Sequence, residues 1–173
     1  MKIVILGPTG SGKSTQSEFI SKLLKIKHIN LGERFREIAK KNKYIKKFVS
    51  EGRLVPNKIT LKLIKNLTNK EDYVLDGFPR DITQAKSFKE KIDLVIFLKA
   101  SKKKILERLS IRKREDDTLE DIERKYHIYL KQTLPVVKYY KNKKILATVN
   151  GTSKEKIVNE KIRKILIRYQ QQQ

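Results

Sequence analysis

Short apolar runs alternate with longer segments in which apolar residues recur every three or four positions. The apolar runs are bounded by turn residues and predict buried strands at 2–6, 27–29, 73–75, 94–98 and 145–149. The spacing between them predicts helices at about 13–24, 31–50, 57–68, 81–90, 101–112, 118–141 and 153–169. Such alternation is typical of an α/β protein, so we expect a doubly wound, parallel sheet of five strands.

The length and composition of the chain indicate a single domain. The chain has 173 residues, of which 38% are hydrophobic, enough for one core, so we expect a single domain over 1–173. No run approaches the roughly 20 apolar residues of a membrane span, and the N-terminus leads straight into a predicted strand. We therefore expect a cytoplasmic protein without a membrane partner.

The metal-binding side chains are few. The sequence has no Cys, and its two histidines, His28 and His127, are far apart along the chain. A thiolate zinc site is thus excluded, and we expect no zinc.

A formal net charge of +23 makes nucleic-acid binding an alternative class of function. Lysines supply most of the charge and are scattered along the whole chain in pairs and triplets, as at 102–104. Dispersed lysines are more typical of a solvated surface than of a localised binding patch. Nucleic-acid binding stays open but is not favoured.

The strongest motif follows the first predicted strand. Residues 7–14 read GPTGSGKS and match the P-loop pattern GxxxxGK[ST] between a strand and a helix. Its backbone amides and the helix N-terminus would bind phosphate, Lys13 would reach the β- and γ-phosphates, and Ser14 would ligate Mg²⁺. The predicted ATP-binding residues here are Gly7, Gly10, Ser11, Gly12, Lys13, Ser14 and Thr15. This motif alone leaves GTPases, ATPases and many kinases open.

A second motif narrows the choice. Residues 76–80 read DGFPR after a predicted strand, which resembles the signature of the adenylate kinases. The segments KSTQ, HINLGERFR, EGRLVP, DGFPRDITQA, ERLSIRKREDDT and YLKQTLPVVKYY follow in the order and spacing of that family. The resemblance implies a P-loop nucleoside-triphosphatase fold, MgATP and AMP as substrates, and a reaction that yields two ADP.

The resemblance also implies an acceptor site. Arg36 and Arg80 would hold the AMP phosphate, and guanidinium suits this bidentate task. Gln84 would read the adenine edge, which favours AMP, and Asp76 would orient the water shell of Mg²⁺. The remaining residues implied for AMP binding are Gly32, Leu54, Val55 and Gly77. A mobile AMP-binding insertion would cover about 30–59.

A third implied region is a short lid at about 110–119, where Arg108 would stack on the ATP adenine. Arg112 and Arg114 would embrace the transferred phosphoryl group, held in place by Asp116 and Asp117. Arg108 and Arg112 are four residues apart and would share one helical face.

Two positions depart from the family pattern. Lys125 stands where the family places a phosphate-binding arginine, and the neighbouring Arg124 would lie on a different helical face. We expect Lys125 to supply charge without the guanidinium fork. Leu31 stands where the family commonly has Thr, so a kinase for CMP, UMP or another monophosphate remains the alternative. We expect a monomer.

Overall fold

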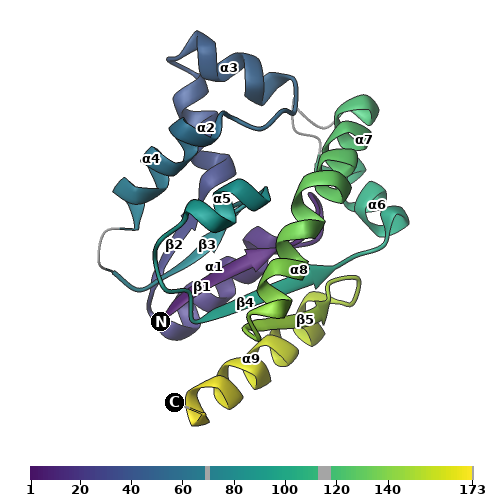
Figure 1. Cartoon of the computed structure of the whole chain (residues 1–173). Helices are drawn as coiled ribbons and strands as arrows, with labels where there is room; N and C mark the ends of the chain where they lie inside the picture. The colour runs from purple at the N-terminus through teal and green to yellow at the C-terminus, as the bar shows by residue number, and fades with distance from the viewer. Residues whose placement is uncertain (69–70, 113–117, 173) are drawn as a thin grey trace.

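The computed structural model of the chain describes residues 1–68, 71–112 and 118–172. Within these ranges, five parallel strands form one sheet in the order β2-β3-β1-β4-β5, with β1 at its centre (Figure 1). The strands are β1 (Lys2–Leu6), β2 (Lys27–Asn30), β3 (Tyr73–Asp76), β4 (Leu94–Lys99) and β5 (Leu146–Asn150). The predicted parallel α/β sheet is therefore confirmed.

Helices cover both faces of the sheet, because successive strand residues point to opposite sides. Ile3 and Ile5 of β1 belong to the core under one face, and Val4 and Leu6 to the core under the other. The first core includes residues of α1 (Lys13–Leu24) and α9 (Glu155–Gln171). The second includes residues of α2 (Leu31–Ala39), α3 (Lys43–Ser50), α4 (Asn57–Leu67), α5 (Ile82–Ser87) and α8 (Leu134–Asn142).

A smaller apolar cluster joins the two remaining α-helices near the P-loop. It contains Ile105 and Leu109 of α6 (Lys102–Arg112) and Ile122 of α7 (Leu119–Ile128). The predicted lid residues Arg114, Asp116 and Asp117 fall between these helices, outside the described residues.

The predicted helix at 31–50 is wrong in one respect, since the structure has two helices there. The chain leaves the helical path after Ala39 and starts again at Asn42, whose side-chain oxygen accepts a hydrogen bond of 3.1 Å from the Ile45 N–H. An asparagine in extended conformation at this position caps the new helix.

The predicted helix at 118–141 is continuous but widens in its middle. A π-helical turn, η1 (Tyr129–Thr133), joins α7 to α8, and the Leu134 N–H donates to the Tyr129 carbonyl five residues back. Pro135, which has no N–H, is the second residue of α8, just after this turn. The helix therefore accommodates the missing donor with a local change of hydrogen-bond pattern.

No helix in the described part of the chain is both long enough and apolar enough to cross a membrane.

Candidate functional site

The P-loop forms a tight cradle between β1 and α1. Gly7, Gly10 and Gly12 all adopt positive φ, of 152°, 80° and 95°. A Cβ at Gly7 would lie only 2.7 Å from the Leu98 carbonyl oxygen, so a larger residue would displace the loop. Positive φ favours glycine, and such a curl allows the backbone amides of a loop to point inward at an anion. The sequence thus builds an anion-binding loop at the carboxyl end of the central strand.

A cleft of about 340 Å³ opens over this loop. The predicted site residues that line it are Gly10, Gly12, Lys13, Ser14, Thr15, Gly32, Arg36, Leu54, Val55, Asp76, Gly77, Arg80, Gln84, Arg108, Arg112 and Lys125. Gly7 lines a smaller adjoining pocket, and Ser11 is buried within the loop. Residues far apart in sequence are therefore gathered at one edge of the sheet.

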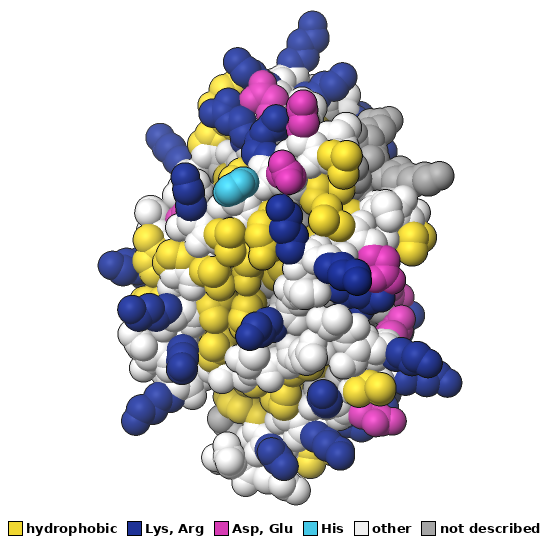
Figure 2. All heavy atoms as spheres, turned by 90° about the vertical axis from the view of Figure 1, so that its right-hand side faces the viewer, with side chains coloured by type: hydrophobic (Ala, Val, Ile, Leu, Met, Phe, Trp, Pro, Cys, Tyr) yellow, Lys and Arg dark blue, Asp and Glu magenta, His cyan; other side chains and the backbone are white. Residues whose placement is uncertain are grey.

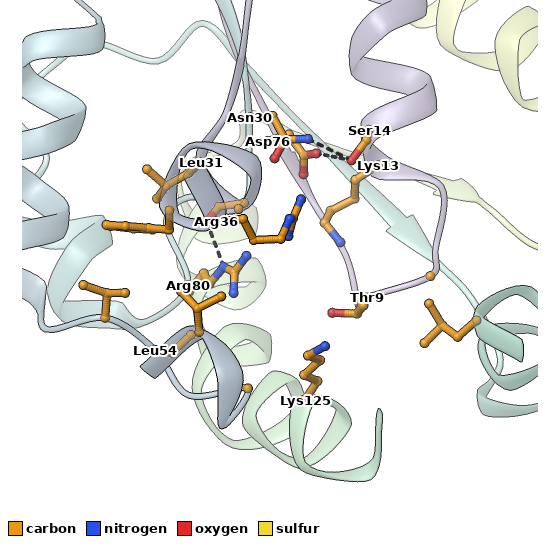
Figure 3. A pocket seen from close by; sticks show the side chains of 18 of the residues that line it. Thr9, Lys13, Ser14, Asn30, Leu31, Arg36, Leu54, Asp76, Arg80 and Lys125 are labelled. Atoms are coloured by element: carbon orange, nitrogen blue, oxygen red, sulfur yellow. Dashed lines mark hydrogen bonds between the residues drawn. The ribbon is translucent and has the colours of Figure 1, made fainter. Parts of the chain in front are cut away.

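Cationic groups converge on the cleft from several elements. Figure 3 shows Lys13, Arg36, Arg80 and Lys125 reaching toward a common space from the P-loop helix, α2, the segment after β3 and α7. This space would attract a polyanionic ligand such as nucleotide phosphates.

Lys13 is held against the P-loop backbone. Its Nζ donates a 2.8 Å hydrogen bond to the Pro8 carbonyl oxygen. The pKa of Lys13 is lowered to about 8, chiefly by burial; the carboxylate of Asp76 opposes this shift, and the positive charges of Arg80 and Arg112 contribute to it. The amine is thus positioned before any phosphate arrives.

Three oxygen- and nitrogen-bearing side chains meet where β2, β3 and α1 come together (Figure 3). Ser14 Oγ donates a 2.6 Å hydrogen bond to Asp76 Oδ2, and Asn30 Nδ2 donates to Ser14 Oγ at 3.2 Å. Asp76 is buried. A hydroxyl and a carboxylate beside a phosphate loop fit Mg²⁺, which prefers oxygen ligands. By contrast, the described residues contain no group of three or more potential metal ligands of the His, Asp and Glu types.

The arginines differ in how they are held. Arg80 Nε donates to the Gly77 carbonyl at 2.9 Å, and the Arg108 guanidinium donates to the Ser11 carbonyl at 3.3 Å. Arg36 makes no ion pair within the described ranges, whereas Arg34 on the same helix pairs with Glu37 at 2.8 Å. Arg36 is therefore the arginine of α2 that is directed to the cleft.

Gln84 lines the cleft and is buried. Its Oε1 accepts a hydrogen bond from the Arg80 backbone N–H at 2.8 Å, and its Nε2 donates to Asn57 Oδ1 at 2.8 Å. One N–H of the amide remains for a ligand. Leu31 and Val55, both buried, supply apolar surface to the same cleft.

Lys125 and Arg124 separate as the helical geometry predicts. Lys125 lines the cleft, and its side chain passes Gly52. Arg124 instead pairs with Asp121 at 3.2 Å and donates to the Glu51 carbonyl. Lysine is thus the residue of this pair that faces the cleft.

Sequence reasoning missed four polar cleft residues, Thr9, Asn30, Arg53 and Thr60. Thr9 occupies a variable position of the P-loop pattern, so the motif gives no signal for it. Asn30 ends β2 directly opposite Asp76 in β3. Knowledge of the strand pairing would have found it, since the two residues stand at the same carboxyl edge of the sheet.

Comparisons with known proteins point in the same direction. Residues 5–145 match the family described as adenylate kinase. An adenylate kinase of Clostridium perfringens (strain SM101) is 34% identical, over 96% of this chain and 98% of the relative. An adenylate kinase of Encephalitozoon cuniculi is 37% identical, over 94% and 96% respectively. One from Clostridium tetani is 32% identical, over 96% and 98%.

Proposed function

The chain belongs to the adenylate kinase family, and from this premise we propose that its cleft binds MgATP and AMP side by side and transfers the γ-phosphoryl group between them. The protein is a nucleoside monophosphate kinase, and adenylate kinase activity yields two ADP reversibly. The observation that carries the residue assignment is the convergence of Lys13 and several arginines on one cleft.

Phosphoryl transfer needs alignment and charge stabilisation more than covalent chemistry. Lys13 and Arg112 would hold the phosphates of ATP, together with the amides of the P-loop, and Arg108 would stack on the adenine of ATP. Arg36 and Arg80 would hold the phosphate of AMP in line with them. Lys125 would add positive charge at the junction, as a point charge without a planar fork.

Ser14 and Asp76 would hold Mg²⁺, Asp76 through coordinated water. Bound Mg²⁺ neutralises phosphate charge. The 2.6 Å contact between the two side chains supports this assignment, because it brings a hydroxyl and a carboxylate oxygen together at the phosphate loop.

The adenine of AMP would lie against Gln84. The amide offers an N–H to a ring acceptor, while Leu54 and Val55 would pack on the base. Gly32 and Gly77 leave room near the Arg80 guanidinium, because a Cβ on either would lie within 3.5 Å of it. These contacts support AMP as the acceptor.

Several predictions rest on the family resemblance alone. They are the roles of Arg114, Asp116 and Asp117, the mobile insertion at 30–59 and the short lid at 110–119. Closure of both segments would exclude water from the reaction. We also propose a cytoplasmic monomer for which nucleic-acid binding is the disfavoured alternative, to be tested by cell fractionation, light scattering and RNA titration.

The first test is a coupled assay with MgATP and each nucleoside monophosphate in turn. We expect rapid formation of ADP with AMP, and little nucleoside diphosphate with CMP or UMP. Preference for CMP or UMP would contradict the AMP assignment and implicate Leu31 in acceptor choice. Absence of transfer to every acceptor would contradict the proposal as a whole.

Two neighbouring arginines provide a matched pair of variants for this assay. Arg36→Ala removes a cleft guanidinium and should lower kcat/KM for AMP by roughly 10²- to 10³-fold, the usual cost of one such donor. Arg34→Ala removes an exposed, ion-paired arginine from the same helix and should stay within about twofold of the wild type. Equal losses in both variants would show that α2, and not the Arg36 guanidinium, carries the effect.

A further inference from the structure

Asn30 connects two parts of the cleft through the two ends of one amide. Its Oδ1 accepts a hydrogen bond of 3.0 Å from the Glu33 N–H and caps α2, the helix that carries Arg36. Its Nδ2 donates to Ser14 Oγ at 3.2 Å (Figure 3). The pairing of β2 with β3 sets Asn30 beside Asp76, so the sheet itself fixes the position of this amide.

The hydroxyl of Ser14 is consequently held from two sides. A serine hydroxyl has one proton to donate and two lone pairs that accept. Its proton goes to Asp76 Oδ2, and one lone pair accepts the N–H of Asn30. One lone pair remains for a ligand in the cleft. Two hydrogen bonds restrict rotation of the hydroxyl, whereas one would leave it freer to turn away.

Capping of α2 does not by itself require an asparagine at position 30. Ser, Asp and Asn are about equally good at the N-cap, but only the Asn amide combines a capping oxygen with an N–H that can reach a second partner. Asn42 provides an internal comparison: its Oδ1 caps α3 at 3.1 Å, and it does not line the cleft. The contact to Ser14 is therefore a separate property of Asn30.

We propose that Asn30 is a positioning residue for Ser14, keeping its free lone pair directed at the cation that accompanies ATP. Asn30 acts through Ser14 and does not itself hold the cation. The inference rests on the proposed function, because it takes MgATP to be the phosphoryl donor. It adds that the same side chain joins the donor site to the N-terminus of α2 on the acceptor side.

The test compares Asn30→Ser with Asn42→Ser. Serine keeps the cap at both positions. At position 30, however, its shorter side chain lacks the amide N–H that Asn30 donates to Ser14. ATP binding is measured by calorimetry without an acceptor, once with Mg²⁺ and once with EDTA. For Asn30→Ser we expect the Kd of ATP to rise about 2- to 10-fold with Mg²⁺, the worth of one net hydrogen bond, and to stay unchanged with EDTA. Asn42→Ser should leave both Kd values unchanged.

Two results would overturn the proposal. Equal weakening with Mg²⁺ and with EDTA would mean that Asn30 supports the P-loop in general, and no change in either condition would mean that Ser14 needs no support. Thermal unfolding of both variants monitors folding, and Asn30→Ala, which loses the cap as well, should add a fall in Tm to the same Mg²⁺-dependent effect. A wild-type protein that bound MgATP but phosphorylated no monophosphate would contradict the proposed function, while the comparison of Asn30 variants would remain interpretable.

Discussion

At the scale of single residues, Lys13 shows how the cleft is prepared for an anion. Burial lowers its pKa from 10.5 to about 8, so near pH 8 only part of the free protein carries this charge. Burial makes the ammonium form of Lys13 unfavourable in the free protein, Asp76 offsets part of this cost, and the arginines nearby add to it. Bound phosphate groups would raise the pKa of Lys13 again, because their negative charge favours its ammonium form. The unfavourable charge of Lys13 in the free protein therefore makes the cleft bind a polyphosphate in preference to a neutral ligand.

Nucleotide binding should accordingly take up protons. Because bound phosphate raises the pKa of Lys13 from about 8, ATP binding at pH 8 should take up about half a proton per site, and affinity should fall as the pH rises further. Calorimetry in two buffers of different ionisation enthalpy measures this uptake. At pH 6.5 Lys13 is already charged and should take up little, and Lys13→Met should abolish the uptake at pH 8. Undiminished uptake in that variant would assign the proton to another group.

At the scale of elements, the sequence predicts what depends on neighbours along the chain. Residues 94–98 read as a strand because they form a continuous apolar run, as expected for β4, which is buried on both faces, and the P-loop is a local motif. The break between α2 and α3 escaped prediction because apolar spacing continues across it, and a side-chain cap at Asn42 decides it. The role of Asn30 escaped because it depends on the register of β2 with β3, which is set by contacts distant in sequence.

The contribution of the Asn42 cap to the stability of the protein can be measured by substitution. Asn42→Ala removes the acceptor for the Ile45 N–H and should destabilise the protein by about 1 kcal/mol, a fall in Tm of roughly 2–4 °C for a chain of this length. Thermal unfolding followed by circular dichroism measures the change. A Tm equal to that of the wild type would mean that α3 is held by packing of Ile45 and not by its cap.

At the scale of the whole molecule, the positive charge is spread over the surface. Figure 2 shows Lys and Arg side chains scattered over one face around a band of hydrophobic side chains. The ion pairs among the described residues are mostly exposed, as for Lys22 and Glu18, and such pairs contribute little. With 42 basic and 19 acidic residues, repulsion between like charges should outweigh these pairs.

Salt should therefore stabilise this protein. Screening shortens the range of charge interactions from about 30 Å at 0.01 M to about 10 Å at 0.1 M, which weakens repulsion between dispersed lysines more than it weakens close pairs. We expect Tm to rise with sodium chloride over this range. Because an anion bound at the P-loop would also raise Tm, the same series is run with Lys13→Met, and an equal rise in both proteins assigns the effect to the surface. A fall in Tm with salt would show that the ion pairs dominate.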